Sequence, residues 1–354
     1  MAIHVDIEKK LGRFQLKAAF DAEDETLALL GASGCGKSMT LKCIAGVENA
    51  DRGRIVLNGR TLFDSERHIN LPPQQRKVGL MFQNYALFPQ MSVRQNLLCG
   101  LAQSTPKSKR AGAVINALKK YDLEDVADHL PGQLSGGQQQ RTALARMMIS
   151  GPEILMLDEP FSALDTHLRF RIEEEIRHAI EEFGGTVILV SHNRDEVYRL
   201  ADRVAVLEAG QIERIASREE IFRNPGTVNA CLLTGCKNIS EIQRAEDGLV
   251  YAKEWGISLR CTPSEGTNAI GIRMHSILPG QGENAFRCRV VEVIENPFSV
   301  TVMLRPIQAP DHARAIGWEI EKRVWETIKA QELTIHFPAE SIMQLKGEKH
   351  AEKC

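Results

Sequence analysis

A glycine-rich octapeptide near the N-terminus constrains this chain more than any other stretch. Residues 31–38 read Gly-Ala-Ser-Gly-Cys-Gly-Lys-Ser and fit the phosphate-binding pattern G-x-x-x-x-G-K-[ST]. The apolar run at 26–30 predicts a buried strand before the octapeptide, and residues 39–45 predict a helix after it. Strand, glycine-rich loop and helix in this order are the context that the pattern requires.

A loop of this kind binds phosphate through its backbone. Glycines let N–H groups turn towards an anion, and the N-terminus of the following helix adds partial positive charge. We expect Lys37 to contact the β- and γ-phosphates of a nucleotide and the Ser38 hydroxyl to bind Mg²⁺. The full set of expected contacts is Gly31, Ser33, Gly34, Cys35, Gly36, Lys37, Ser38 and Met39. The alternative is a glycine-rich turn with a chance Lys-Ser pair, which the flanking strand and helix disfavour.

Length and composition exclude several other classes of protein. The 354 residues are enough for two or three domains, and a net charge of -2 does not call for a nucleic-acid partner or an anionic membrane. The eight cysteines form no C-x-x-C pair, so we predict neither a zinc site nor a disulfide framework and expect a reducing cytosol. The first residues do not resemble a signal peptide, and no apolar run approaches the roughly 20 residues that span a bilayer, so we expect any membrane role to be peripheral.

Two hairpins are predicted around the phosphate-binding loop. Residues 3–20 alternate apolar and polar and predict two antiparallel strands that turn near Gly12. Phe14 is a candidate for stacking on a nucleotide base, although a place in the core of its strand is at least as well supported. The pair Asn58-Gly59 after a short apolar run predicts a second hairpin.

A second glycine-rich segment lies within a predicted helical insert at about 90–150. Residues 134–138 read Leu-Ser-Gly-Gly-Gln, in which Ser135 and Gln138 match a capping box. Gly136 and Gly137 have low helix propensity and leave N–H groups open to an anion. We therefore predict a second phosphate-binding site in these four residues. The alternative is a well-capped helix and no more.

Polar residues end three further predicted strands. Gln83 follows the strand at 76–82 and is a candidate ligand of Mg²⁺ or of the attacking water, because nucleotides bind at the carboxyl edge of such sheets. Asp158 is expected to hold Mg²⁺ through water, and Glu159 to accept a proton from the attacking water. His192 stands at the end of the predicted strand at 185–192 and is expected to hydrogen-bond the γ-phosphate. Each of these residues taken alone is more often structural or solvated, and the phosphate-binding loop upstream reverses that balance.

Together these motifs resemble those of the ATP-binding subunits of ABC transporters. The P-loop at 31–38, the Q-loop glutamine Gln83, the LSGGQ motif at 134–138, Asp158-Glu159, the D-loop at 162–165 and the switch histidine His192 occur in the family's order. The resemblance covers roughly residues 1–230. It implies an α/β P-loop NTPase domain of the ABC ATPase type with a helical insert, ATP and Mg²⁺ as cofactors, and Asp165 as a further residue of the nucleotide site. The base-stacking aromatic is often Tyr in these proteins, whereas Phe14 stands at the candidate position here.

The resemblance also implies partners. Two copies would pack head to tail, with each ATP between Lys37 of one copy and Ser135 and Gly137 of the other. ATP would close this homodimer, and hydrolysis assisted by Glu159 would open it. The region from Gln83 to Phe88 would contact membrane-embedded permease subunits on the cytoplasmic face of the cell membrane. Exporters usually carry their membrane helices on the same chain, so an importer is favoured, with an extracytoplasmic binding protein acting indirectly and no nucleic acid involved.

The C-terminal part has a different pattern. Short segments with turn signals between them predict a small β-barrel. These segments are 249–251, 257–260, 269–273, 286–293, 299–304 and 333–337. Residues 272–277 and 284–298 resemble the TOBE domain of importer ATPases, an OB-like barrel used for dimer contacts and regulation. We therefore predict an ABC ATPase domain at 1–232 and a TOBE-like domain at 233–354, which either binds an oxyanion or only dimerises.

The pattern at 233–238 is most similar to that of molybdate and sulfate importers, so molybdate is the expected cargo. Sulfate, ferric iron, polyamine and sugar importers use the same ATPase and are the alternatives. A soluble ABC ATPase that acts on DNA or ribosomes is an alternative of another class. Such proteins usually carry two cassettes or a long inserted coiled coil, and the sequence predicts neither. A purely regulatory oxyanion sensor is disfavoured because Glu159 and His192 are both present.

Overall fold

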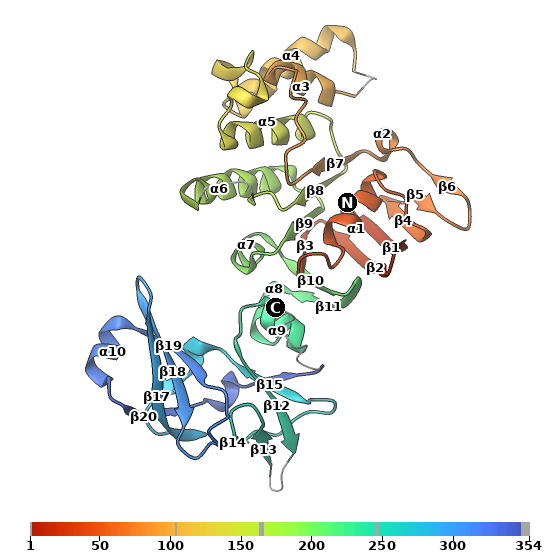
Figure 1. Cartoon of the computed structure of the whole chain (residues 1–354). Coiled ribbons are helices and arrows are strands. Elements are labelled where there is room, and N and C mark those ends of the chain that lie inside the picture. Colours follow the sequence, from red (N-terminus) through yellow and green to blue (C-terminus); the bar gives the residue numbers. More distant parts are fainter. Residues whose placement is uncertain (1, 103–104, 163–165, 245–247, 348–354) are drawn as a thin grey trace. The chain divides into compact units, whose positions relative to one another are not determined.

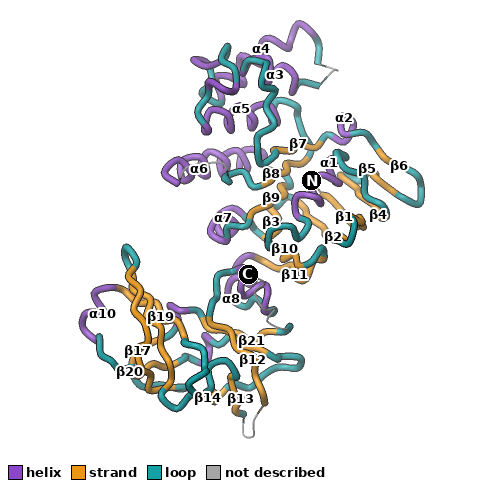
Figure 2. Tube along the Cα trace, viewed as in Figure 1, coloured by secondary structure: helices purple, strands orange, loops and turns teal. Residues whose placement is uncertain are grey.

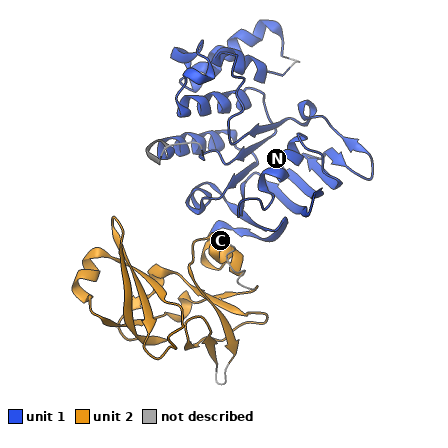
Figure 3. Cartoon of the chain, in the orientation of Figure 1, with its two compact units in different colours: residues 1–218 blue, residues 219–354 orange. Residues whose placement is uncertain are grey.

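The chain forms two compact units in a computed structural model that describes residues 2–102, 105–162, 166–244 and 248–347. One unit is Met1–Arg218 and the other is Glu219–Cys354 (Figure 3). The division therefore comes earlier in the chain than the boundary predicted after residue 232. Its physical reason is the helix α9 (Val228–Leu233), because Val228 and Cys231 are buried in a cluster with Ile239 and Ala269 of the second unit.

The first unit is built on one sheet of eleven strands among the described residues, in the order β6-β5-β4-β1-β2-β11-β10-β3-β9-β8-β7. Neighbours from β10 to β7 pair in parallel, whereas β1, β2, β4, β5 and β6 form an antiparallel part. The strands are β1 (Ala2–Leu11), β2 (Phe14–Glu23), β3 (Thr26–Gly31), β4 (Arg52–Leu57), β5 (Arg60–Asp64), β6 (Ile69–Asn70), β7 (Val78–Met81), β8 (Ile154–Asp158), β9 (Val187–Ser191), β10 (Arg203–Glu208) and β11 (Gln211–Ser217). The predicted α/β class is confirmed.

Both predicted hairpins are present. The β1–β2 hairpin turns at Gly12, which has a φ of 60°, and its strands pair from Leu11↔Phe14 out to Ala2↔Glu23. Asn58 and Gly59 have φ values of 49° and 76° and join β4 to β5 as a two-residue turn. Positive φ at both central residues gives the turn the twist that antiparallel strands require.

The helices of the first unit fall into two groups (Figures 1 and 2). They are α1 (Lys37–Ala45), α2 (Pro73–Arg76), α3 (Val93–Gly100), α4 (Lys107–Lys120), α5 (Gly136–Met148), α6 (Thr166–Phe183) and α7 (Arg194–Leu200). Two 3₁₀ turns at Glu124–Val126 and Pro131–Gln133 lie between α4 and α5. The helices α3, α4 and α5 gather at one end of the unit, where Val93, Leu97, Val114, Leu118 and Leu123 are buried in a core of their own. The predicted helical insert is therefore confirmed as a separately packed layer.

The second unit is all-β apart from short helices. Over its described residues, the strands form two five-stranded sheets, in the orders β14-β13-β12-β15-β21 and β16-β20-β17-β18-β19. The strands are β12 (Asn238–Arg244), β13 (Leu249–Ala252), β14 (Ile257–Arg260), β15 (Ala269–Ile272), β16 (Leu278–Pro279), β17 (Ala285–Glu295), β18 (Ser299–Pro306), β19 (Ile316–Glu321), β20 (Glu332–His336) and β21 (Met343–Leu345). The helices are α8 (Arg218–Arg223), which begins at the unit boundary, α9, α10 (Lys322–Ile328) and 3₁₀ turns at Met274–Ser276 and Ala339–Ser341.

One core joins the two sheets of this unit. Trp255, Phe286 and Phe337 pack edge to face, with ring centroids 5.6 to 5.8 Å apart, and Trp318 is buried in the same cluster. The six predicted strands are all present, whereas β12, β16, β19 and β21 were not predicted. No helix in the described parts of the chain is long and apolar enough to cross a membrane.

Candidate phosphate and hydrolysis site

Three parallel strands bring the predicted site residues to one edge of the sheet. In the register, Leu30 of β3 lies opposite Ser191 of β9, and Val190 of β9 lies opposite Asp158 of β8. The P-loop, Glu159 and His192 follow these strand ends directly. Residues more than 100 positions apart in the chain therefore meet at the carboxyl edge, where α/β sheets bind ligands.

The P-loop is wrapped around the side chain of Lys37, which is only 5% exposed. Its Nζ donates hydrogen bonds to the carbonyl oxygens of Gly31 at 2.7 Å and Ala32 at 2.9 Å. Gly36 precedes α1 with a φ of 108°, and no side chain caps the helix there. A Cβ at Gly36 would lie 2.8 Å from Leu16 Cδ1. The loop conformation thus depends on glycine and leaves the first N–H groups of α1 without a side-chain acceptor.

The other predicted P-loop residues lie on its two sides. Ser33 and Gly34 are exposed at the crest of the loop, and Gly34 has a φ of 79°. Cys35 is buried, with its Sγ 3.8 Å from Lys37 Nζ. Met39 is half-buried and packs against the main core of the unit. The thiol of Cys35 is therefore turned into the loop, and its amide donates to the Ala32 carbonyl at 3.3 Å.

Ser38 and Asp158, the two predicted Mg²⁺ ligands on the P-loop helix and on β8, lie next to each other. The Ser38 hydroxyl donates to Asp158 Oδ1 at 2.7 Å. Burial raises the pKa of Asp158, and the hydrogen bond from Ser38 acts in the opposite direction. A hydroxyl and a carboxylate at hydrogen-bond distance are hard oxygen donors, so these two residues fit Mg²⁺. Gln83 is exposed, and its Nε2 lies 3.5 Å from Glu159 Oε2, at the far limit of a hydrogen bond.

Glu159 and His192 are in direct contact. Oε1 of Glu159 lies 3.1 Å from Nδ1 of His192, and the carboxylate is 19% exposed while the imidazole is 63% exposed. Glu159 has a φ of 47°, in the left-handed region that non-glycine residues rarely occupy. Its amide bonds the Val190 carbonyl at 2.9 Å, and its carbonyl accepts from the Ser162 amide and hydroxyl. This strained conformation, which the sequence did not predict, turns the carboxylate towards the end of β9.

The second glycine-rich segment begins α5 as predicted. The Gln138 amide donates to Ser135 Oγ at 3.3 Å, and the Ser135 amide donates to Gln138 Oε1 at 2.9 Å, so the capping box is confirmed. Gly136 and Gly137 form the first helical residues, and a Cβ at Gly137 would lie 3.1 Å from Ile172 Cδ1. Because α5 belongs to the helical insert and α1 packs beside the sheet, the structure does not bring this segment and the P-loop together within the unit (Figure 1).

Two further predicted residues have different outcomes. Phe14 is half-buried and packs against the main core, and a Cβ at Gly36 would lie 3.2 Å from its Cζ. Its ring therefore lies next to Gly36 of the P-loop, and base stacking stays a prediction. Asp165 lies outside the described residues.

Comparison with known proteins identifies the family. Residues 20–162 match the family model described as ABC transporter. The spermidine/putrescine import ATP-binding protein PotA of Nitratidesulfovibrio vulgaris is 43% identical over 258 residues, which are 72% of this chain and 68% of that protein. The chain belongs to the ABC transporter family. It is therefore an ABC-type ATPase with the P-loop NTPase fold.

Other relatives agree with this assignment. The sulfate/thiosulfate import ATP-binding protein CysA of Methylococcus capsulatus is 41% identical over 68% of this chain and 70% of that protein. PotA of Oleidesulfovibrio alaskensis is 43% identical over 66% of this chain, and the match spans 60% of that protein. Among solved structures, the dimeric post-hydrolysis state of the ATP-binding cassette MJ0796 bound to ADP and Pi has a TM-score of 0.51 and 27% identity, covering 62% of this chain and 99% of that one.

The segment after Gln83 is held by a residue that the sequence did not single out. Arg146 of α5 donates to the Ala86 carbonyl at 2.8 Å and the Tyr85 carbonyl at 3.0 Å. Its guanidinium also lies over the ring of Phe88, 5.4 Å from the centroid. An arginine three turns into a predicted helix carries no local signal for this role, because its partners are about 60 residues upstream.

Arg146 also lines a cavity of about 440 Å³ in the first unit. Apolar side chains from β7, from the segment after it and from α5 line most of this cavity. They include Met81, Phe82, Phe88 and Met147. Phe88 is 47% exposed although it is aromatic. The cavity therefore combines apolar walls with one cation.

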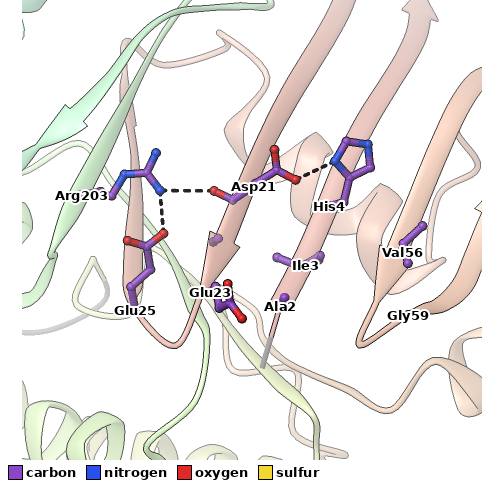
Figure 4. A pocket seen from close by; sticks show the side chains of 10 residues that line it. Ala2, Ile3, His4, Asp21, Glu23, Glu25, Val56, Gly59 and Arg203 are labelled. Atoms are coloured by element: carbon purple, nitrogen blue, oxygen red, sulfur yellow. Dashed lines mark hydrogen bonds and ion pairs between the residues drawn. The ribbon is translucent and has the colours of Figure 1, made fainter.

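A second cavity, of about 590 Å³, lies at the other edge of the sheet (Figure 4). It is lined near the start of β3 by Glu25 and Arg203, which are paired at 2.7 Å. His4 Nδ1 lies 2.6 Å from Asp21 Oδ1 on the neighbouring strands. These charges are engaged with one another, and the P-loop begins at the opposite end of β3. The predicted phosphate-binding residues therefore lie at the carboxyl edge, away from this cavity.

Proposed function

We propose that this chain is the ATP-hydrolysing subunit of an ABC importer. The observation that carries this proposal is the meeting of Lys37, the Ser38–Asp158 pair and the Glu159–His192 pair at one edge of the sheet. Loop amides and Lys37 would hold the phosphates, and Ser38, Asp158 and Gln83 would hold Mg²⁺. When bound, Mg²⁺ supplies charge that offsets the negative charge developing on the phosphates.

The hydrolysis step would depend on the Glu159–His192 pair. Glu159 would accept the proton of the attacking water, because its carboxylate is partly exposed and reaches towards the P-loop edge. His192 Nδ1 contacts Glu159, and with the ring doubly protonated its Nε2 would donate to the γ-phosphate at the same time. This arrangement divides the work between a base and a residue that orients it.

A homodimer would complete the site. The subunit has one P-loop and one LSGGQ segment, and they lie on different layers of the first unit. A second copy related by a two-fold axis would bring Ser135, Gly136, Gly137 and Gln138 to the ATP held by the first copy. Asp165 would lie at the same interface, as the family resemblance implies. The solved cassette similar to this chain is dimeric, which supports this proposal.

The cavity beside Arg146 is the proposed docking site for permease subunits. Its apolar walls at Phe82 and Phe88 suit an amphipathic helix of a membrane-embedded partner. Arg146 ties this cavity to the segment after Gln83, so docking and the hydrolysis site share one element. The subunit would then lie peripherally on the cytoplasmic face of the membrane, and the substrate-binding protein would act on it only through the permease.

The second unit is proposed to be a TOBE-type regulatory domain with an OB-like fold. Its two small antiparallel sheets over one aromatic core support this proposal. For the cargo, the relatives above are named for spermidine and putrescine or for sulfate and thiosulfate. These names support a polyamine first and sulfate second, both among the alternatives to the molybdate that the sequence pattern suggested.

Substitution of Glu159 by Gln tests the hydrolysis proposal. The variant keeps the phosphate and Mg²⁺ ligands but loses the base, so it should bind ATP, hydrolyse it at least about a hundredfold more slowly and elute as an ATP-dependent dimer. Glu153→Gln, at the other end of β8, is the matched control and should hydrolyse ATP at the wild-type rate. A Glu159→Gln variant with wild-type turnover would show that another group is the base.

The cargo is tested in vesicles that hold the subunit with its membrane partner. Binding protein is added with spermidine, putrescine, sulfate, molybdate or no ligand, and ATP hydrolysis is measured. Stimulation by a polyamine alone would support the proposed cargo. Stimulation by sulfate or molybdate alone would replace it, and the absence of any co-purifying membrane partner would contradict the importer assignment.

A further inference from the structure

A buried carboxylate lies behind the switch histidine. Glu196 of α7 is only 4% exposed. Its Oε2 accepts a hydrogen bond from the Ser191 hydroxyl at 2.6 Å, and its Oε1 accepts one from Asn193 Nδ2 at 3.2 Å. Ser191 and Asn193 are the two chain neighbours of His192. Glu196 therefore binds the side chains of the residues on both sides of the exposed imidazole.

Further bonds close this loop. The Asn193 amide donates to Ser191 Oγ at 2.9 Å, and the Asp195 amide donates to Asn193 Oδ1 at 2.9 Å. The Val197 amide donates to the Asn193 carbonyl at 3.1 Å, which is the first hydrogen bond of α7. The side chain of His192, in contrast, is 63% exposed and contacts Glu159. Its orientation thus depends on a loop whose hydrogen bonds converge on one carboxylate.

The same carboxylate is linked to the turn after β8, which contains Glu159. Arg169 of α6 places its Nη1 3.8 Å from Glu196 Oε1, and its Nη2 donates to the Phe161 carbonyl at 3.4 Å. Phe161 is buried and follows Glu159 by two residues. A second bond, from Gln140 Nε2 to the Pro160 carbonyl at 3.1 Å, holds the residue between them. Arg169 therefore connects the loop after β9 to the turn after β8.

The charges around Glu196 favour this role. Burial raises its pKa, while Arg169 and the Ser191 hydroxyl act to lower it. A buried carboxylate without partners is costly, so these donors are what make its position tolerable. Glu173 on α6 faces the same region but has its own partner, since Arg199 donates to both of its oxygens. The two buried carboxylates thus have separate cations.

We propose that Glu196 is a positioning residue for ATP hydrolysis. It orients His192 through Ser191 and Asn193, and it orients Glu159 through Arg169 and the Phe161 carbonyl. One buried carboxylate then sets the geometry of both members of the Glu159–His192 pair. This inference rests on the proposed ATP hydrolysis, and its test has a readout that does not need turnover.

The kinetic test is Glu196→Gln, which keeps the shape of the side chain. The side-chain NH₂ of the introduced glutamine replaces one carboxylate oxygen of Glu196 and cannot accept a hydrogen bond. Either the bond from Ser191 or the bond from Asn193 must therefore be lost. We expect kcat to fall at least about tenfold, because small displacements of catalytic groups have large effects on rate. The ATP KM should stay within about twofold, since the bonds of Lys37 and Ser38 are untouched.

Glu173→Gln is the matched control. It removes the same charge from an equally buried residue on a neighbouring helix, and its kcat should stay within about twofold of the wild type. Equal losses of kcat in the two variants would reduce Glu196 to a structural residue and overturn the proposal. A rise in the ATP KM that accounts for the whole loss in Glu196→Gln would overturn it as well.

The second readout is the His192 ring signals in a carbon-proton NMR spectrum of the nucleotide-free protein. We expect these signals to shift or broaden in Glu196→Gln and to stay in place in Glu173→Gln. Unchanged signals would overturn the positioning role. If the wild-type chain hydrolyses no ATP, the proposed function fails, and the NMR comparison still decides whether Glu196 orients His192.

Discussion

The two glycine-rich helix N-termini of the first unit are built in opposite ways. The P-loop reaches α1 through Gly36 in the left-handed region, and no side chain caps the helix. The LSGGQ segment reaches α5 through Ser135 in the extended region, with a complete capping box to Gln138. Both segments have glycines where an anion can approach. They differ in whether the helix has already satisfied its own N–H groups.

This difference indicates how each segment could take part in binding. The P-loop is held in shape by the bonds from Lys37 to two of its carbonyls and by the bond from the Cys35 amide to the Ala32 carbonyl, and no side chain caps the helix that follows. At the LSGGQ segment the Gln138 amide is already bonded to Ser135, which leaves the N–H groups of Gly136 and Gly137 in the first turn without a side-chain acceptor.

The largest effect is expected for Gly36→Ala. The new Cβ would lie 2.8 Å from Leu16 in a backbone conformation that alanine rarely adopts, so we expect a loss of about 2–4 kcal/mol in the free energy of unfolding and of detectable ATP binding. Chemical denaturation and nucleotide titration measure both. Gly12 also has a positive φ, but a Cβ added there would meet no atom within 4 Å. Gly12→Ala therefore controls for backbone strain alone. Normal ATP binding by Gly36→Ala would contradict the preformed loop.

Removing the P-loop cation is expected to have the next largest effect. Lys37→Ala takes a buried ammonium from the loop, so the Kd for ATP should rise about 10–100-fold because charged hydrogen bonds are lost. Lys42→Ala removes the same charge from the other end of α1 and should bind ATP with near wild-type affinity. Fluorescence titration with a labelled nucleotide gives both constants. Equal constants for Lys37→Ala and wild type would exclude a phosphate contact.

The cap of α5 is tested by Ser135→Ala. Losing the capping box should cost about 1 kcal/mol, or a fall in Tm of about 2–4 °C. Ser92→Ala removes the same kind of box from α3 and should destabilise the unit equally. Only Ser135→Ala should also lower ATP turnover if a second copy uses this serine. Equal turnover in the two variants would leave Ser135 with a structural role only.

Gly137→Ala should have a small effect on stability. The residue is helical, so alanine gains up to about 1 kcal/mol of propensity, and the flexible tip of Ile172 must move by a few tenths of an ångström. The two terms nearly cancel, and we expect Tm to change by less than about 2 °C. Thermal unfolding checks this. A loss as large as that of Gly36→Ala would show that the two glycines are equivalent after all.

A comparably small effect is expected away from both helix N-termini, at the start of β8. The hydrogen bond from Lys77 holds the pKa of Glu153 below its usual range. A carboxylate whose pKa is lower in the folded than in the unfolded state stabilises the fold at pH values above its unfolded-state pKa of about 4.3. This stabilisation is lost as the pH falls through the folded-state pKa. Glu153→Gln should therefore lower Tm by about 1–3 °C at pH 7, and the gap should close in acid. A gap that widened in acid would contradict the sign of this shift.

Much of the site was predictable because its signals are local. The P-loop and the α5 capping box each lie within eight consecutive residues, and each recurs in the structure as expected. The pairing of Ser38 with Asp158 was predictable for another reason, since parallel strands end at the same edge. The left-handed φ of Glu159 and the bonds of Arg146 had no local signal.

The second unit shows the same limit. Strand β19 was not predicted from the sequence. Its apolar residues Ile316, Trp318 and Ile320 occupy every second position, so the two-residue period of a strand was present. Strand β12 had no such pattern. Its Asn238 exchanges two hydrogen bonds with the backbone of Gly317, and this buried pairing gives the strand its place. An asparagine signals a turn locally and becomes a strand residue only when a distant partner satisfies it.

The sequence alone therefore determined the family, the α/β class and which residues can bind phosphate, because these follow from short patterns whose hydrogen bonds close within one turn. Tertiary structure decided how the hydrolysis site is held together. Glu196 reaches both members of the Glu159–His192 pair only because β8, β9, α6 and α7 converge there. A buried carboxylate takes its role from the donors around it, and those donors come from residues that no local pattern connects.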